Sequence, residues 1–329
     1  MDRKPPHLDS SESDGARFGL SGASWLSLFF QGVVIGVSPA IFSASHLESY
    51  GLGIFVFGPA LTAFIGGLAA RWGGARHRAE PYVAAVGGMM LAGFIMLVSG
   101  VEGAICLLMA TPLLIVMALA GAALSSVISS GWLSVMVCGG AGAGALTADS
   151  VLQAQQGRGN VSHVTVGVVR GTPEDVWPLV VQQGELSPPS FWMFKMGVAH
   201  PVRTLCDAES VGTARQCVLS TGVIEETVTE SRPGQVFEFE AHSTPPSMVE
   251  FNPFHSEVAA GHLHNYIEMH RGRFELRALP GGRTEIRCTS WYTNRFAPLA
   301  YWRLWSDEIV RQVHLQVLTD IDRRVSSRG

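Results

Sequence analysis

Charged side chains are scarce in the first half of this chain of 329 residues. Residues 1–150 contain 14 of its 50 Asp, Glu, Lys and Arg residues, and residues 151–329 contain the other 36. This division predicts two regions with different surroundings. The formal net charge of -4 is close to neutral, so the composition gives no basis for a nucleic-acid partner.

Closely spaced cysteine pairs are missing as well. The chain has five cysteines with no CxxC pair among them, at Cys106, Cys138, Cys206, Cys217 and Cys288. Two of them lie in the charge-poor half. The scatter excludes a disulfide framework and suits a reducing compartment.

Charge is absent altogether from long apolar runs in the first half. Residues 25–45, 51–70 and 81–101 contain no Asp, Glu, Lys or Arg, and residues 103–148 form a fourth run of 46. Crossing a bilayer takes about 20 apolar residues in a helix. The core of a soluble protein could imitate one such run but hardly four in succession. We therefore predict a transmembrane region over 21–148, after a disordered tail at 1–20.

The transmembrane region is expected to act as an anchor. Charge inside a membrane span is the usual mark of an ion or proton pathway, and these runs have none. Gly140 and Gly144 form a GxxxG pair, which permits close helix packing, so we expect that a homo-oligomer could form through the membrane helices. Cleavage after 43–45, as in a signal peptide, would still leave a membrane protein.

The number of crossings depends on residues 103–148, which are long enough for one helix or for two. Basic residues are enriched in cytoplasmic loops. Four crossings put the basic residues that flank the runs on one side, namely Arg3, Lys4, Arg17, Arg71, Arg76, Arg78, Arg158 and Arg170. We therefore predict four spans in the inner (cell) membrane, with the C-terminal domain at the cytoplasmic face. Five spans remain the alternative.

The second half shows strand and helix patterns after a polar linker at 149–160. Strands are expected at 161–170, 200–206, 212–220, 223–231, 235–242, 264–278 and 283–292. The sequence Thr-Pro-Glu-Asp at 172–175 is typical of a helix start. Residues 298–324 repeat apolar positions at spacings of three and four, which predicts a long last helix. This order predicts an α+β helix-grip domain, in which a curved antiparallel sheet and the last helix enclose an apolar space.

Residues 161–325 resemble the START-like (SRPBCC) superfamily, which includes the polyketide cyclase/dehydrase and lipid-transport families and the Bet v 1-type proteins. The resemblance rests on GTPEDVW at 171–177 and PGGRT at 280–284. Further segments, RGRF at 271–274, TSWY at 289–292 and YWRLWSD at 301–307, resemble a less-studied bacterial branch. The resemblance implies a cavity for a hydrophobic ligand. It implies no reaction, because the superfamily shares no catalytic motif that matches here.

The candidate cavity residues are mostly aromatic. They are Trp177, Phe194, Glu225, Phe239, His264, Tyr266, Trp291, Tyr292, Trp302, Trp305 and Ile309. Ordinary core packing is an equally good account of the aromatic ones. Glu225 and Glu226 are neighbours on a strand, so one of them could point into the cavity and act as an acid or base. A solvated sheet edge is the alternative for both.

Four histidines fall within 16 positions, at His255, His262, His264 and His270. A zinc site needs three or four converging ligands, and no cysteine is near these histidines in the sequence. We therefore expect no metal and no cofactor. Residues 243–262 hold three prolines and form a long loop, which could be a lid over the cavity. Its Met248, Phe251 and Phe254 could also dip into the bilayer surface.

Three functions fit these observations. The first is a membrane-anchored domain that binds a hydrophobic small molecule or lipid. The second is a cyclase/dehydrase-like or hydrolase-like enzyme, which a carboxylate and a histidine within hydrogen-bond reach in the cavity would favour. The third is a ligand-responsive membrane sensor, which requires contact between the two halves.

Overall fold

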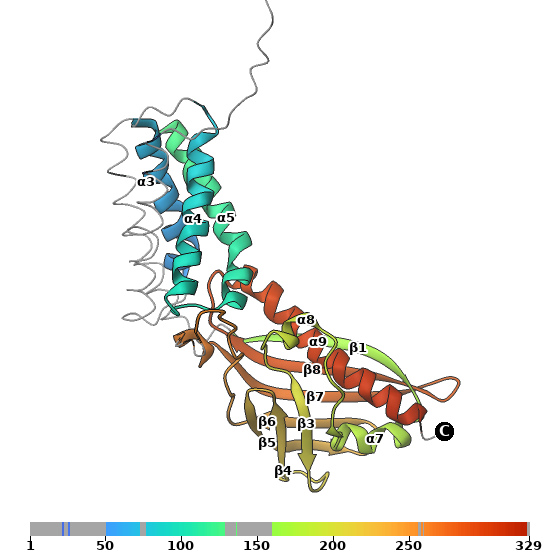
Figure 1. The fold of residues 1–329 in the computed structure, drawn as a ribbon. Coiled ribbons are helices and arrows are strands. Elements are labelled where there is room, and N and C mark those ends of the chain that lie inside the picture. Colours follow the sequence, from blue (N-terminus) through green and yellow to red (C-terminus); the bar gives the residue numbers. More distant parts are fainter. Residues whose placement is uncertain are drawn as a thin grey trace, which may run out of the picture.

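The computed structural model describes residues 51–72, 77–128, 160–255, 258 and 260–327, together with the single residues 22, 26 and 136. The described residues form a helical bundle and a curved sheet with a long helix against it (Figure 1). The bundle stands at one end of the sheet region. The predicted fold class, apolar helices followed by an α+β helix-grip domain, is therefore confirmed.

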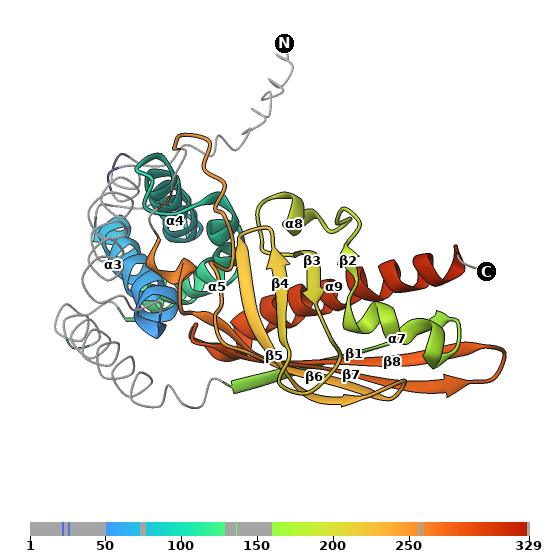
Figure 2. The same cartoon turned by 90° about the horizontal axis from the view of Figure 1, so that it is seen from below.

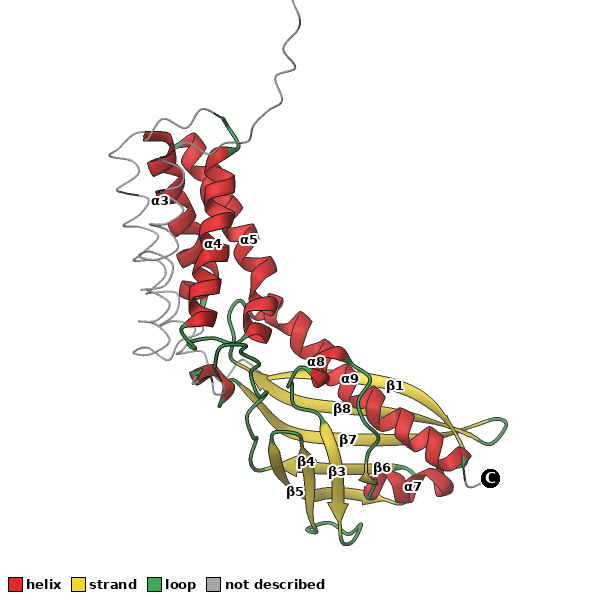
Figure 3. Cartoon of the chain, viewed as in Figure 1, coloured by secondary structure: helices red, strands yellow, loops and turns green. Residues whose placement is uncertain are grey.

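Three helices of the bundle are long and apolar enough to cross a membrane. The first joins η3 (Gly53–Phe57) to α3 (Gly58–Trp72) and has 20 residues in all; α4 (Glu80–Val98) has 19 and α5 (Ala104–Val127) has 24. They lie side by side in Figure 3. They match the runs predicted at 51–70 and 81–101 and the first half of the run at 103–148. The predicted tail at 1–20, the run at 25–45 apart from Leu26, the Gly140–Gly144 pair and the predicted linker at 149–159 lie outside the described residues.

Small residues let these helices approach closely. A Cβ atom added to Gly121 of α5 would lie 2.0 Å from the backbone oxygen of Ala60 in α3. The outward surface of α4 and α5 is apolar, with exposed large side chains at Val83, Met90, Phe94, Leu108, Val116, Leu119 and Leu124. An apolar surface of this extent suits contact with lipid.

The second region is one antiparallel sheet of eight strands in the order β1-β8-β7-β6-β5-β4-β3-β2. Its strands are β1 (Asn160–Arg170), β2 (Gly184–Glu185), β3 (Pro201–Cys206), β4 (Ala214–Leu219), β5 (Gly222–Arg232), β6 (Val236–Ala241), β7 (Ile267–Leu279) and β8 (Arg283–Asn294). The helices of this region are α7 (Pro173–Val181), α8 (Trp192–Lys195), η5 (Gly261–Leu263) and α9 (Leu299–Ser326). Figure 2 shows α9 lying along one face of the sheet.

Local sequence explains why these elements form where they do. In β1 the side chains of Val161, Thr165 and Val169 are buried and those between them are mostly exposed, as the alternation predicts. At the start of α7, the Thr172 hydroxyl accepts a hydrogen bond from the Asp175 backbone, and the Asp175 carboxylate accepts one from the Thr172 backbone. Pro178 lies within α7, which is only nine residues long.

Two large apolar cores and one small one, formed by Val161, Tyr292 and Val310, lie in the described part of the sheet region. Of the two large cores, one lies between the sheet and the C-terminal part of α9, and includes Phe237, Ile286 and Ile321, which are fully buried. The other lies at the start of α9 and includes Trp302 together with Ile105 and Met109 of α5. The foot of α5 is therefore part of the same packed core as the helix-grip domain.

Candidate functional site

A cavity of about 230 Å³ lies between the sheet and α9. Most of its walls are apolar and come from the inner face of the sheet, from α9 and from residues 244–248. Its apolar lining includes Ile224, Phe239, Phe274, Met248, Phe296, Ile309 and Val313. Cys106 and Met109 of α5 also line it, so one of the membrane-type helices contributes to the wall. Clefts with apolar walls and a few polar groups are typical of small-molecule sites.

Five of the predicted residues line this cavity: Phe239, Tyr292, Trp302, Trp305 and Ile309. They come from inward positions of β6 and β8 and from the face of α9 that packs on the sheet. Whether they contact a ligand stays a prediction. The other six predicted residues are placed elsewhere, each for a local reason.

Strand alternation accounts for two of the six. Glu225 points outward, where its carboxylate accepts hydrogen bonds from the Gln216 amide, so the prediction that it faces the cavity is corrected. Its neighbour Glu226 points inward and lines the cavity. Trp291 lies on the outer face, with the Arg271 guanidinium carbon 3.8 Å from its ring centroid.

The remaining four lie in cores or at the surface. Trp177 packs edge-on against Phe237, and its indole N–H donates to the Glu209 carboxylate. Phe194 stacks on the His200 ring, and the Tyr266 ring lies 4.9 Å from that of Phe296, centroid to centroid. His264 is exposed at the end of η5.

The most buried charges of the cavity wall form a pair. Arg215 of β4 and Glu226 of β5 make an ion pair, and their side chains are only 4% and 3% exposed. The Arg215 guanidinium also lies 4.1 Å from the Phe239 ring centroid. Burial raises the pKa of Glu226, while Arg215 opposes that rise. The pair is a fixed polar feature in a mostly apolar wall.

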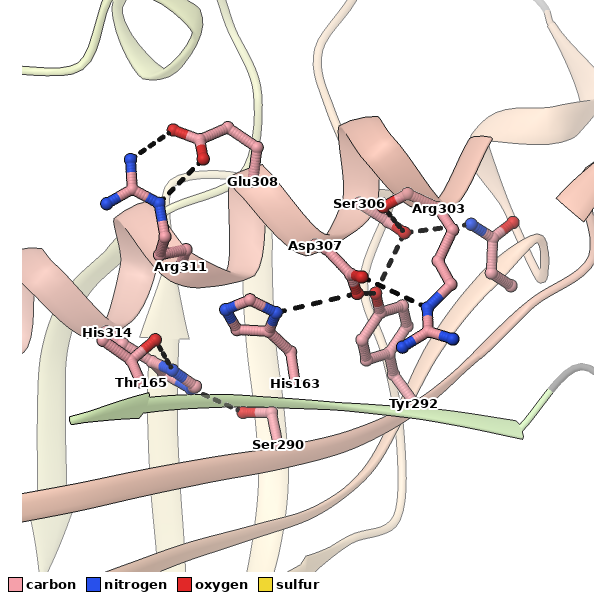
Figure 4. Close-up of polar contacts among 11 residues, drawn as sticks. His163, Thr165, Ser290, Tyr292, Arg303, Ser306, Asp307, Glu308, Arg311 and His314 are labelled. Atoms are coloured by element: carbon pink, nitrogen blue, oxygen red, sulfur yellow. Dashed lines mark hydrogen bonds and ion pairs between the residues drawn. The ribbon is translucent and has the colours of Figure 1, made fainter. Parts of the chain in front are cut away.

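A buried histidine of α9 was missed from the sequence. His314 lines the cavity, and its ring nitrogens lie 2.9 Å from Thr165 Oγ1 and 2.9 Å from Ser290 Oγ (Figure 4). Burial, with a smaller contribution from His163, lowers the pKa of His314 to about 3, so the ring is neutral. The available signal was its position, next to the apolar face of α9 that begins at Trp302.

A second polar group surrounds Tyr292 of β8 (Figure 4). Its hydroxyl donates to Asp307 Oδ1 at 2.7 Å and lies 2.9 Å from Ser306 Oγ. Asp307 also accepts from Arg303 Nε at 3.1 Å. Burial, first, and the Asp307 contact raise the pKa of Tyr292, so the phenol stays protonated. These groups can fix the polar end of an otherwise apolar ligand.

Residues 249–255, here named the junction loop, join the helix-grip domain to the foot of α5. The Glu250 carboxylate accepts hydrogen bonds from the backbone of Ile105 at 3.3 Å and of Cys106 at 3.1 Å. The Phe251 backbone oxygen accepts from Ala104 at 2.8 Å. The first turn of a helix has backbone N–H groups without partners inside the helix, and the junction loop supplies acceptors for three of them.

The same loop also contacts the end of α4. Asn252 Nδ2 donates to the backbone oxygens of Leu97 at 2.8 Å and Glu102 at 3.2 Å. His255 Nε2 lies 2.7 Å from the Val98 backbone oxygen. The loop predicted as a lid thus has two parts, because residues 244–248 line the cavity and residues 249–255 hold two helix ends.

Comparisons with known proteins add little to this geometry. No protein-family model matches the chain, and no curated protein matches it. Among solved structures, Zhui aromatase/cyclase from Streptomyces sp. R1128 is 13% identical, with a TM-score of 0.33, and the match covers 52% of this chain and 98% of that one.

Two further solved structures match to a similar extent. The di-domain aromatase/cyclase StfQ of steffimycin biosynthesis is 9% identical, with a TM-score of 0.36, and 54% of each chain is covered. Norcoclaurine synthase from Thalictrum flavum is 8% identical, with a TM-score of 0.32, and the match covers 51% of this chain and 96% of that one. These values are too low for a reaction or substrate to be transferred to this chain.

Proposed function

We propose that the chain is a membrane-anchored binding protein that takes a hydrophobic small molecule or lipid into the cavity between the sheet and α9. The observation that carries the proposal is the composition of the wall, in which residues of the sheet and α9 meet Cys106 and Met109 of α5. A helix suited to lipid thus reaches the cavity, so an apolar ligand could pass from the bilayer with little exposure to water. The START-like resemblance of residues 161–325 agrees with this function.

A variant that fills the cavity tests the proposal. The full chain is purified from membranes in detergent, and bound molecules are identified by native mass spectrometry and organic extraction. We expect about one apolar molecule per chain in the wild type and much less in Ile309→Trp, whose new ring occupies the cavity. The matched control is Leu304→Trp on the same helix, where the native side chain is 69% exposed. Equal occupancy in all three proteins would contradict the proposal.

A ligand-responsive sensor is the second candidate. It requires contact between the halves, and the junction loop provides hydrogen bonds to both α4 and α5. A ligand that shifts residues 244–248 in the cavity wall would pull directly on that loop. The expected observation is a ligand-dependent change in the distance between spin labels on α4 and on the sheet. An unchanged distance would leave only the binding function.

The enzyme alternative receives less support from the side chains of the cavity. The inward carboxylate, Glu226, is paired with Arg215, and the buried His314 is held by Thr165 and Ser290. The carboxylate and the imidazole therefore have different partners. General acid–base catalysis needs each group within hydrogen-bond reach of the proton that it transfers to or from a substrate, and here both groups already hydrogen-bond to other side chains of the protein.

The bundle supports five crossings rather than four, and with them the opposite side for the C-terminal domain. The Arg71 guanidinium donates to the Ser125 backbone oxygen at 2.8 Å, so the arginine-bearing loop and the end of α5 lie together. Residues 97–106 and the helix-grip domain lie at the other end. The 24 residues of α5 are about 36 Å long, and β1, which begins at Asn160, belongs to the domain at the foot of that helix, so we propose a fifth crossing. Arg170 carries little weight against this, because it belongs to a folded domain and pairs with Asp322.

Fusions at the C-terminus test which side the domain occupies. Alkaline phosphatase is active outside the bacterial cytoplasm, and green fluorescent protein fluoresces inside it. If the arginine loop is cytoplasmic, we expect phosphatase activity and no fluorescence from the C-terminal fusions. Fusions placed after Arg78 should give the reverse pattern and serve as the control. Fluorescence from the C-terminal fusion would favour the four-span prediction instead.

A further inference from the structure

A carboxylate, a thiol and an imidazole meet at the foot of α5. Glu102 lies in the loop between α4 and α5, Cys106 in the first turns of α5, and His262 in η5. Their donor atoms all lie within 4.8 Å of one another. The side chains of His262 and Glu102 are only 2% and 7% exposed. We propose that these three residues bind a divalent cation of the zinc type.

The residue types and distances fit such a cation. Zinc is bound by cysteine sulfur at about 2.3 Å, histidine nitrogen at about 2.0 Å and carboxylate oxygen at about 2.1 Å, which puts neighbouring ligands of a tetrahedral site roughly 3.5 Å apart. Cys106 Sγ lies 2.8 Å from His262 Nε2, and Glu102 Oε1 lies 3.9 Å from His262 Nδ1. With one ligand atom taken from each residue, the three atoms lie within 4.8 Å of one another, so binding requires them to adjust to roughly 3.5 Å around a common centre.

The charge around the thiol favours a cation over a free nucleophile. Glu250 is a second carboxylate beside the group, since its Oε1 accepts from the Cys106 backbone at 3.1 Å. A thiolate that attacks a substrate is stabilised by nearby positive charge, and two carboxylates provide the opposite. The same carboxylates attract a metal ion, which would in turn stabilise the thiolate. The Met248 sulfur, 4.0 Å from Cys106 Sγ, adds a soft, polarisable neighbour.

The cation would join two parts of the chain that are 156 positions apart. Its ligands come from the loop after α4, from α5 and from the loop before β7, and Cys106 also lines the cavity. A bound metal would therefore clamp the start of α5, with the loop before it, to the helix-grip domain at the cavity wall. The sequence-based expectation of no metal did not include this set, because Cys106 and His262 are 156 positions apart.

Cobalt substitution tests the site on the full chain in detergent. The protein is stripped with a chelator and titrated with Co²⁺, whose thiolate complexes show an intense near-ultraviolet charge-transfer band. We expect one Co²⁺ per chain with this band, displacement by Zn²⁺, and loss of the band in Cys106→Ser. We also expect His262→Gln and Glu102→Gln to weaken Zn²⁺ binding by about tenfold or more.

Two matched controls separate this site from general metal binding. Cys217→Ser removes another cysteine of the cavity wall, and His264→Gln removes an exposed histidine two positions from His262. Both should bind Co²⁺ like the wild type. The proposal is overturned if the wild type gives no thiolate band, or if the His262 and Glu102 variants bind Zn²⁺ as tightly as the wild type does. These two variants decide the question even if Cys106→Ser does not fold. The result is independent of whether a hydrophobic ligand is bound.

Discussion

Replacing Glu250 by alanine should loosen the first turn of α5 without unfolding the sheet. The carboxylate accepts two backbone hydrogen bonds, from Ile105 and Cys106, and Ile105 is completely buried. Hydrogen bonds to charged groups contribute about 1.5–3 kcal/mol each, and loss of a helix N-cap costs about 0.5–2 kcal/mol. Burial raises the pKa of Glu250, because it disfavours the charged carboxylate, and this cost offsets part of the stabilisation by the hydrogen bonds. We therefore expect the free energy of local opening at the first turn of α5 to fall by about 2–3 kcal/mol.

Hydrogen exchange measured by mass spectrometry detects this loss. At about 1.4 kcal/mol per factor of ten, peptides covering 103–110 should exchange roughly 30- to 150-fold faster in Glu250→Ala. Glu250→Gln keeps an acceptor oxygen and should show a smaller increase, and Glu225→Ala, which removes an outward carboxylate, should show none. Peptides from β8 should be unchanged in all three. Unaltered exchange at 103–110 in the alanine variant would refute the role given to the junction loop.

Three further predictions concern other parts of the molecule. Burial holds the pKa of His314 at about 3, so below about pH 6.5 the unfolded chain binds a proton that the folded chain does not. The contribution of His314 to the free energy of unfolding is therefore complete above that pH and should fall by about 2 kcal/mol at pH 5. Denaturant unfolding measures this loss, and His314→Gln should show a flatter pH profile. Arg215→Met leaves Glu226 buried without its partner and should cost about 3–5 kcal/mol, much of which the double variant with Glu226→Met should restore. Gly121→Ala should lower the melting temperature of the detergent-solubilised chain, because its Cβ would meet the backbone of α3, whereas Gly93→Ala, with no atom nearer than 3.9 Å, should not.

Local patterns predicted most of the helix-grip domain. The alternation at 283–292 corresponds to β8, and its inward residues Ile286, Cys288 and Tyr292 are almost fully buried. The Thr-Pro-Glu-Asp segment starts α7 where the capping residues indicated. These features depend on neighbours one to four positions away, which a single sequence contains. The two-residue strand β2 has too little sequence for any pattern to indicate it.

Features that depend on distant parts of the chain were harder to predict. Which of Glu225 and Glu226 points into the cavity depends on which face of β5 meets α9. Alternation alone states only that the two side chains point to opposite faces of the sheet. The cation site joins residues of both halves. The basic residues of the sequence alone favour four crossings, whereas the packing of the junction loop against α4 and α5 favours five.

The junction loop also has a consequence for the order in which the molecule is made. Glu250 is synthesised 145 positions after Ile105, whose backbone N–H lies at the start of α5. At about 5–20 residues per second, a ribosome needs roughly 7 to 30 seconds for that length. During this interval the helix is already complete in sequence, yet its first turn lacks the acceptors that it has in the finished protein. The last steps of folding at this end of the bundle therefore wait for the far half of the chain, and a chain that stops before residue 250 leaves that turn open.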